Sequence, residues 1–262
     1  KVAISSTYED KYLFFLPIVT WAWDKLGVGV ICFLPSMKFN GEQKKIDLIN
    51  HVIEQNKLRC DKYSFEAPQH KEATYAQVSR LYAACLDLPE DEVLITSDVD
   101  LLPFKTPPYI SGFTIHGSDL VPQGQYPMCF ISAKAKDWRN AFRLCYGAAP
   151  MSPKDATIEL KVKTYQECLD ETVGVIECEH FRGNQWGLDQ STAYNKINPT
   201  QEINLLPRAR PNTQFANHRA DRDDINWRAY VNEELIDAHL WRPGYTDENF
   251  ANILELLTMK FP

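Results

Sequence analysis

Two carboxylates, Asp98 and Asp100, directly follow an apolar segment, residues 92–97, that has the composition of a β-strand. In open α/β sheets, ligands bind beyond the carboxyl ends of the strands, and both side chains would project there. Carboxylates at positions i and i+2 can share one divalent cation, and Mg²⁺ or Mn²⁺ held in this way can bridge to substrate phosphates. The alternative is a polar turn in which Asp98 caps the strand end and Asp100 is solvated. Because the pair stands at a strand end, we favour the ion site.

The segments before this pair alternate between strand-like and helix-like patterns. We expect strands at residues 2–6, 28–34, 60–65 and 92–97, and helices at residues 11–26, 43–55 and 73–86. Strands and helices that alternate over about 100 residues predict an α/β fold with a mostly parallel central sheet and right-handed crossover connections.

The second half of the chain is less regular, and Pro103, Pro107 and Pro108 interrupt it first. Beyond them we expect strands at residues 120–121 and 128–132 and helices at residues 137–146, 185–196 and 248–259, within an irregular C-terminal segment. Since no repeat, low-complexity tract or Gly/Ser linker divides the sequence, we predict one domain over residues 1–262.

Composition and charge exclude several classes of function. The 262 residues carry a net charge of −7, which argues against duplex nucleic-acid binding, because such binding needs many basic contacts to phosphates. Seven scattered cysteines without a Cys-x-x-Cys pair argue against a zinc ribbon or a thioredoxin-type site and favour a reducing, intracellular compartment. The longest mostly apolar stretch, residues 12–23, is shorter than the roughly 20 residues that span a bilayer, so we expect no integral membrane segment.

The Asp98-Val99-Asp100 motif at the end of an N-terminal α/β half resembles the Asp-x-Asp signature of GT-A glycosyltransferases. Residues 1–23 and 96–104 resemble more particularly the glycosyltransferases of large DNA viruses of green algae (chlorella viruses), which build capsid glycans. The resemblance implies a GT-A fold in which residues 1–110 bind the nucleotide sugar and residues 111–262 bind the acceptor.

The same resemblance implies an activity. A sugar would pass from a nucleotide-diphospho sugar to a hydroxyl group of a glycan, with Mn²⁺ or Mg²⁺ as cofactor. The donor would be a UDP-sugar, with UDP-xylose as a first guess. The reaction would take place in the cytoplasm, that of the host cell if the chain is viral.

The resemblance also implies roles for residues of the first half. Thr7 and Tyr8 follow the first strand, where the base or ribose lies in a GT-A fold; an ordinary strand-to-helix turn is the alternative. Asp98 and Asp100 would hold the metal ion and the diphosphate. Arg80, on the helix before the Asp-x-Asp strand, could reach the base or a phosphate, because Arg can bind phosphate oxygens bidentately. A surface ion pair is the alternative for Arg80.

Asp189 is the candidate catalytic carboxylate. The segment 182–190 resembles the Trp-Gly-acid segment of inverting GT-A enzymes, in which the acid is the general base, and also the Asp-Gln segment of retaining enzymes. Inverting members often carry a Glu-Asp pair where this chain has Leu188-Asp189, so the stereochemical course stays open, with inversion favoured. The alternative is that Asp189 N-caps the following helix, and Glu179 would then be the next candidate base.

A late histidine could complete the ion site. Many GT-A enzymes take a third metal ligand from a C-terminal His, and His239, followed by Trp241 and Arg242, matches that order; His218 is the competitor. A neutral imidazole suits Mn²⁺ better than Mg²⁺. The tryptophans that could stack on sugar rings are Trp186, Trp227 and Trp241, although core or rim packing is the commoner role of Trp.

Two other classes of function are weighed against a glycosyltransferase. Haloacid-dehalogenase-type phosphatases also place Asp-x-Asp after an apolar strand, but they carry Asp-x-Asp-x-Thr, and this chain has Leu102 at the Thr position. The third class is a nucleotide- or glycan-binding module without turnover. The chain contains neither Gly-x-Ser-x-Gly nor a P-loop, so a serine nucleophile and a Walker-type site are not expected.

Overall fold

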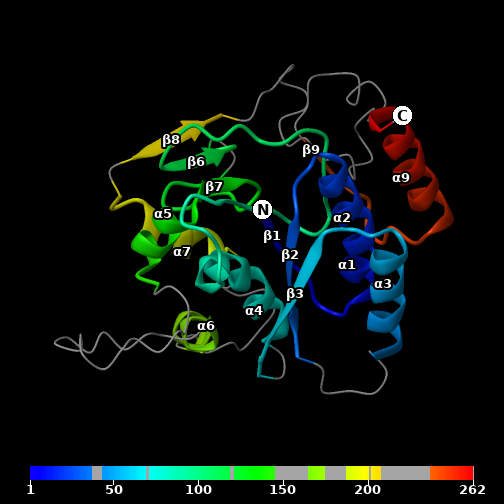
Figure 1. The fold of residues 1–262 in the computed structure, drawn as a ribbon, viewed down its shortest axis with the longest axis horizontal. Coiled ribbons are helices and arrows are strands. Elements are labelled where there is room, and N and C mark those ends of the chain that lie inside the picture. Colours follow the sequence, from blue (N-terminus) through cyan, green and yellow to red (C-terminus); the bar gives the residue numbers. More distant parts are fainter. Residues whose placement is uncertain are drawn as a thin grey trace.

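The computed structural model describes residues 1–36, 43–68, 71–118, 121–144, 165–174, 187–200, 202–207 and 237–261. The strands are β1 (Val2–Ser5), β2 (Val30–Pro35), β3 (Cys60–Phe65), β4 (Val93–Thr96), β5 (Leu101–Pro103), β6 (Phe113–His116), β7 (Ile131–Lys134), β8 (Ile203–Leu206) and β9 (Asp237–His239). The helices are α1 (Asp10–Leu13), α2 (Phe15–Lys25), α3 (Gln43–Gln55), α4 (Glu72–Ser79), the 3₁₀ helix η1 (Arg80–Cys85), α5 (Ala135–Phe142), α6 (Tyr165–Gly174), α7 (Leu188–Ile197) and α9 (Asp247–Lys260). Helices lie on both faces of the central sheet (Figure 1).

The central sheet has seven strands in the order β3-β2-β1-β4-β7-β6-β8. β1 pairs in parallel with β2 and β4, and β2 pairs in parallel with β3. β7 is antiparallel to both β4 and β6, whereas β8 is parallel to β6. Because β1, β2 and β4 run in the same direction, the loops that follow them meet at one edge of the sheet. The predicted α/β fold with a mostly parallel sheet is confirmed.

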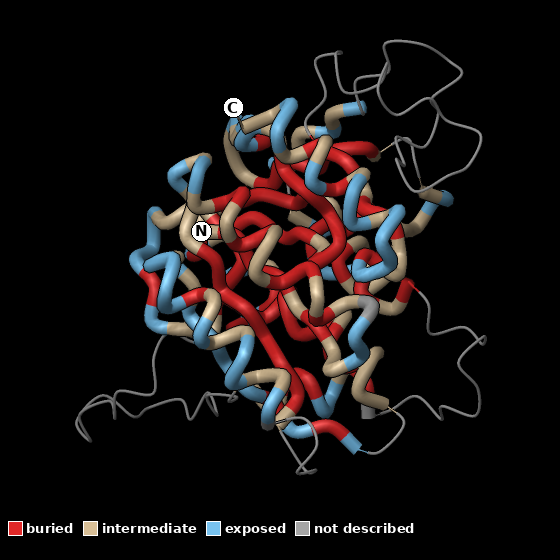
Figure 2. Tube along the Cα trace, turned by 90° about the vertical axis from the view of Figure 1, so that its right-hand side faces the viewer, coloured by how far each residue is buried: buried red, intermediate tan, exposed pale blue. Residues whose placement is uncertain are grey.

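Alternate residues of the central strands pack into two hydrophobic clusters, one on each face of the sheet. Ile31 and Phe33 of β2 belong to a cluster with α4, α5, α6 and α7, whereas Val30 and Cys32 belong to a cluster with α2 and α9. The period of two along a strand explains this division. Every residue of β2 is buried, as expected of a parallel strand covered on both faces. In Figure 2, the buried segments, in red, lie inside and the exposed segments, in pale blue, lie mostly at the outside.

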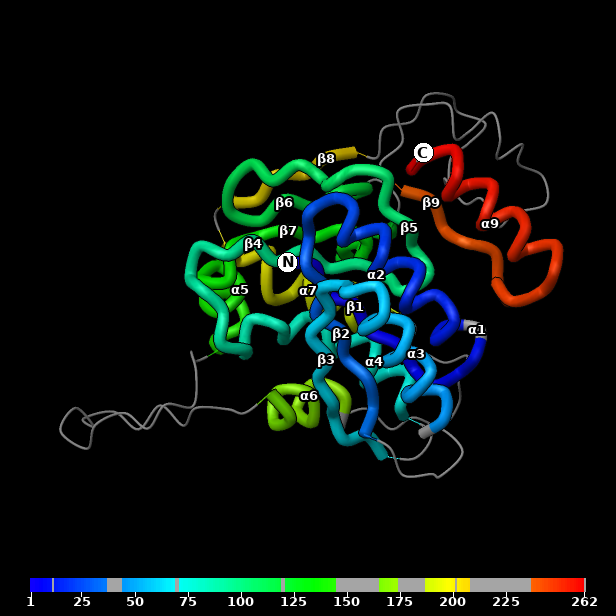
Figure 3. Tube along the Cα trace, turned by 45° about the vertical axis from the view of Figure 1, so that its right-hand side comes forward, coloured from blue at the N-terminus to red at the C-terminus, as the bar shows by residue number. Residues whose placement is uncertain are grey.

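A two-stranded sheet, β5 with β9, joins the last described segment to the first half of the chain. The strands are antiparallel, and Leu101 is paired in register with His239. Figure 3 shows β9 beside β5, with α9 following it. The helix α9 lies against α2, where the rings of Trp21 and Phe261 are 5.2 Å apart at the end of α9. The C-terminal part of the chain is therefore packed against the first half.

Most strands and helices expected in the first half are confirmed, with shifts of a few residues at their ends. The helix expected over residues 11–26 is divided at Phe14 into α1 and α2. The helix expected over residues 73–86 differs in kind, because α4 ends at Ser79 and the chain continues as the 3₁₀ helix η1. Residues 80–84 of η1 are all buried. An amphipathic helix has one buried face and one exposed face. Residues 80–84 have no exposed face, so their conformation follows from packing on all sides and not from an amphipathic pattern.

The second half matches the expectations less closely. The strand expected at residues 128–132 begins only at Ile131, and the helix expected from residue 137 begins at Ala135. The strand expected at residues 120–121 is wrong at Val121, which lies in a bend, and Leu120 is outside the described residues. β5, β6, α6, β8 and β9 were not expected. Within the described residues, no helix combines the length and the apolar character needed to cross a bilayer.

Arg139 of α5 is buried and ties this helix to the chain that leaves η1. Its guanidinium donates hydrogen bonds to the carbonyls of Ala84 (2.9 Å) and Leu88 (2.7 Å). We predict that Arg139→Met lowers the free energy of unfolding by about 2–3 kcal/mol, because it removes a charged donor from buried carbonyl oxygens. Urea unfolding measures the loss. Lys136→Met, on the exposed face of the same helix, is the control, and equal losses in both variants would contradict this role of Arg139.

Candidate active site

The turn between β4 and β5 carries both predicted carboxylates to the edge of the sheet where the parallel strands end. The amide of Leu101 donates to the carbonyl of Asp98 at 3.3 Å, which closes the turn. Asp98 is half-buried, and Asp100 is buried. The Asp-x-Asp motif therefore lies beyond a strand end, as the sequence predicts.

Arg80 connects two of the acidic residues predicted to act in the site, Asp98 and Asp189. Its guanidinium donates one hydrogen bond to the carboxylate of Asp98 and another, of 2.7 Å, to Oδ2 of Asp189. A third bond, of 2.7 Å, reaches the carbonyl of Ser97. The side chains of Arg80 and Asp189 are only 6% and 5% exposed, so this is an internal ion pair. The surface ion pair considered for Arg80 is therefore wrong, because the pair is internal. The contact of Arg80 with a base or a phosphate stays a prediction.

Burial and ion pairing shift the pKa values of the charged side chains of this site in opposite directions. Burial raises the pKa of Asp98, but the positive charge of Arg80 and the nearby His239 bring it below its ordinary value. Burial raises the pKa of Asp189 despite its contact with Arg80, and raises that of Asp100 despite the nearby His239. Burial opposes the charge of Arg80, yet its pKa is raised because Asp98 and Asp189 stabilise the cation. The site thus combines one carboxylate that is held ionised with two that attract a proton more readily.

Asp189 lies in the first turn of α7 but does not cap it. The helix begins at Leu188, and Gly187, with a φ of +94°, occupies the N-cap position. Glycine is favoured there because the left-handed region is strained for other residues. Oδ1 of Asp189 accepts a hydrogen bond of 2.9 Å from the amide of Gln190, while Oδ2 accepts from Arg80. The capping alternative is therefore wrong, and the carboxylate faces the ion-pair network.

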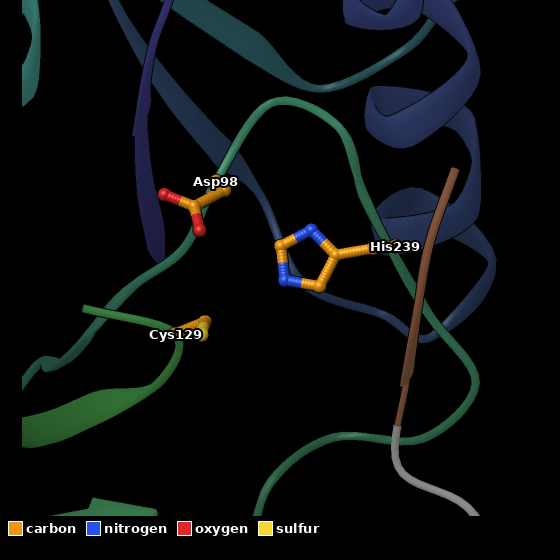
Figure 4. Close-up of side chains that lie close together, drawn as sticks. All are labelled: Asp98, Cys129 and His239. Atoms are coloured by element: carbon orange, nitrogen blue, oxygen red, sulfur yellow. The ribbon is translucent and has the colours of Figure 1, made fainter. Parts of the chain in front are cut away.

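Asp98, Cys129 and His239 converge on one point (Figure 4). Their carboxylate oxygen, thiol sulfur and imidazole nitrogen lie within 4.8 Å of one another, and all three side chains are half-buried. They come from the turn after β4, the segment before β7, and β9. In the part of the chain that the structure describes, these three residues form the group that could hold a metal ion. Asp98 and His239 are thus brought together as predicted.

Asp100 does not belong to this group. Its Oδ2 lies 3.3 Å from Nε of Arg242, and its backbone carbonyl accepts a hydrogen bond of 2.9 Å from Leu240. The guanidinium of Arg242 also lies over the ring of Tyr12, 5.7 Å from its centroid. The two carboxylates of the motif therefore face different neighbours, and the geometry favours Asp98 over Asp100 as an ion ligand.

Cys129 is the residue of the group that the sequence analysis did not identify. No local motif marks it, because Asp98 and His239 are far away in the sequence and reach it only through strand pairing. A useful signal would have been the antiparallel pairing of β4 with β7, which places residues just before β7 near the end of β4.

Thr7 and Tyr8 follow β1 at the same edge of the sheet. The hydroxyl of Tyr8 donates to the carbonyl of Pro35 at the end of β2, and Oγ1 of Thr7 accepts from the amide of Glu9 at 3.4 Å. Both are half-buried and so keep part of their surface open to a ligand. Trp241 packs into the cluster with α2 and α9, which argues against its stacking on a sugar. The candidates that lie outside the described residues are Glu179, Trp186, His218 and Trp227.

Scans of protein-family models and of curated proteins give no match to this chain. The fold itself matches solved structures. The galactosyltransferase LgtC, in complex with donor and acceptor sugar analogs, gives a TM-score of 0.50 at 10% identity over 99% of this chain and 94% of LgtC. An active-site mutant of LgtC gives a TM-score of 0.50 at 9% identity over 99% of both chains. The glycosyltransferase GlyE of Streptococcus pneumoniae TIGR4 gives a TM-score of 0.47 at 10% identity, and the match covers 100% of this chain and 60% of GlyE. The chain has the GT-A fold of glycosyltransferases.

Proposed function

We propose that the chain is a metal-dependent glycosyltransferase that moves a sugar from a UDP-sugar to a hydroxyl group of a glycan. The observation that carries the proposal is the network at the carboxyl edge of a GT-A fold. In it, Arg80 joins Asp98, which belongs to a possible ion site, to Asp189, a second buried carboxylate. An ion ligand and a proton acceptor within one network are what the transfer of a sugar from a diphosphate requires.

The residues present fit a divalent ion. Asp98 offers a carboxylate that Arg80 keeps ionised, and His239 offers an imidazole nitrogen near it. The carboxylate suits both Mn²⁺ and Mg²⁺, and Mn²⁺ accepts an imidazole nitrogen more readily than Mg²⁺ does. A Mn²⁺ or Mg²⁺ ion there would act as a Lewis acid toward the departing diphosphate. Half-buried Arg242 is a second positive group at this edge, and its guanidinium can donate to phosphate oxygens.

Asp189 is the proposed acceptor of the proton from the attacking hydroxyl. Each of its oxygens accepts one hydrogen bond, from Gln190 or from Arg80, and each retains a further lone pair. As the new glycosidic bond forms and the bond to the diphosphate breaks, the proton of the hydroxyl passes to this carboxylate. Arg80 is a positioning residue, since it fixes the orientation of both Asp98 and Asp189.

The sequence resemblance supports the finer parts of the proposal. We propose UDP-xylose as the first donor to test, a viral capsid glycan as acceptor, and the cytoplasm of the infected cell as the place of action. We also propose one domain, with a donor half over residues 1–110 and an acceptor half over residues 111–262. Inversion of the anomeric centre is favoured, and NMR of the product distinguishes it from retention.

Release of UDP from a panel of UDP-sugars with Mn²⁺, with and without a glycan acceptor, tests the activity itself. Release of inorganic phosphate would instead indicate the phosphatase. For that class, Leu102 stands where threonine is expected, and its side chain is fully buried beside α2. Binding of UDP without any release would indicate a binding module.

The role of His239 can be tested through the metal requirement. We predict that His239→Ala raises the Mn²⁺ concentration for half-maximal UDP release at least about tenfold, because even partners that only orient a ligand contribute 10- to 100-fold to metal affinity. Titration of Mn²⁺ at saturating donor measures the shift. His51→Ala, on the exposed side of α3, is the control. An unchanged Mn²⁺ requirement in a normally folded His239→Ala protein would reject His239 as a ligand.

The role of Asp189 can be tested through the difference between kcat and binding. We predict that Asp189→Asn lowers kcat by about 10²- to 10⁴-fold, because a positioned base contributes that much. The Kd for UDP should change little, since the contribution of a base grows only in the transition state. Asp170→Asn is the control, because Asp170 also accepts a hydrogen bond, from Tyr75, on another helix. Activity within a few-fold of the parent would place the base elsewhere.

A further inference from the structure

We propose that Cys129 makes this a thiolate-containing ion site, which binds Zn²⁺ in preference to Mn²⁺ through Asp98, Cys129 and His239. Three protein ligands would leave the fourth position of a tetrahedral ion for an oxygen of the substrate. The ion preference follows from the three side chains alone, whereas a diphosphate oxygen as the fourth ligand rests on the proposed glycosyltransferase function.

The backbone around Cys129 is held firmly against the end of β4. The buried hydroxyl of Thr96 donates to the carbonyl of Met128 (2.8 Å) and accepts from the amide of Ile131 (3.0 Å). The side chains of Met128 and Phe130, on either side of Cys129, are buried in the two different hydrophobic clusters. Cys129 is therefore anchored on both sides, and its position beside Asp98 is a fixed property of the fold.

The side chains of Asp98 and His239 are also held in place by neighbouring residues. Arg80 holds the carboxylate of Asp98, and pairing with Leu101 in the β5–β9 sheet places His239. Asp98 belongs to the stretch from β4 through the turn to β5, and the segments that carry Cys129 and His239 are both hydrogen-bonded to that stretch. Figure 4 shows the three side chains directed into the space between these segments.

The distances and the donor atoms suit zinc. Zn–ligand bonds of about 2.0–2.3 Å place the ligand atoms of a tetrahedral site roughly 3.5 Å apart. The three atoms lie within 4.8 Å of one another, so small side-chain rotations would bring them to that spacing. Thiolate is a soft ligand that Zn²⁺ accepts readily, whereas Mn²⁺ prefers oxygen. Formation of the sulfur–zinc bond releases the thiol proton to solvent.

The competing role for Cys129 is packing alone, because its side chain contacts the cluster with α2 and α9. Such a cysteine would contribute nothing to ion binding, and its replacement by serine would leave metal affinities unchanged. Cys60 provides a matched control. It is also half-buried, and it begins β3 at the opposite end of the parallel strands from the site.

The experiment uses Co²⁺ as a spectroscopic substitute for Zn²⁺. We expect the metal-free protein to bind a single Co²⁺ per chain with a thiolate-to-cobalt charge-transfer band in the near ultraviolet, and added Zn²⁺ to abolish the band. C129S should lose the band and bind Zn²⁺ about 10- to 100-fold more weakly or worse. Its Mn²⁺ affinity, measured by electron paramagnetic resonance, should change far less. C60S should behave as the parent.

The outcomes separate this inference from the proposed function. Absence of the band in the parent protein, or its survival in C129S, would overturn the thiolate site whatever the stability of the variant. UDP release with Mn²⁺ from a chain that lacks the band would keep the glycosyltransferase and reject the zinc site. A band that depends on Cys129, in a chain that releases UDP from none of the sugars, would keep the zinc site and reject the transferase.

Discussion

The double ion pair of Arg80 with Asp98 and Asp189 is the interaction on which the arrangement of the site depends. It joins three segments: η1, the turn after β4, and the first turn of α7. Buried ion pairs gain little net stability, because the cost of removing charges from water offsets their attraction. Removal of one partner is nevertheless expensive, since it leaves a buried charge uncompensated. We therefore regard this network as a device that fixes geometry rather than one that stabilises the fold.

Much of the first half could be predicted from the sequence because its signals are local. The apolar run of β2 and the amphipathic stripe of α3 each lie within one short window, and the alternation of such segments indicates a parallel sheet. The position of Asp98 follows from the same logic, since it directly follows a strand. Asp189 was recognisable as a residue near the start of a helix, although its contact with Arg80 was not.

The rest could not be predicted because it depends on pairing between distant segments. β5, β6, β8 and β9 have only three or four residues each, too few for a periodic pattern, and they form where a partner strand is available. Arg242 reaches the site through the pairing of β5 with β9, and Cys129 reaches it through the pairing of β4 with β7. The sequence also could not distinguish Asp98 from Asp100, because the two side chains are chemically identical. Only the structure shows that Asp98 faces Arg80 and that Asp100 faces Arg242.

The pairing of β5 with β9 has a consequence for how the molecule assembles. His239 reaches the site on a three-residue strand whose partner lies far back in the chain, so a long loop must close before the two strands meet. Contacts between distant segments form late in folding, and the parallel sheet can exist before this one does. An ion held by Asp98 and His239 together would favour the docked strand over the undocked one by mass action. Binding of the ion by both residues would make the docking of β9, and of α9 after it, depend on the concentration of free metal around the protein.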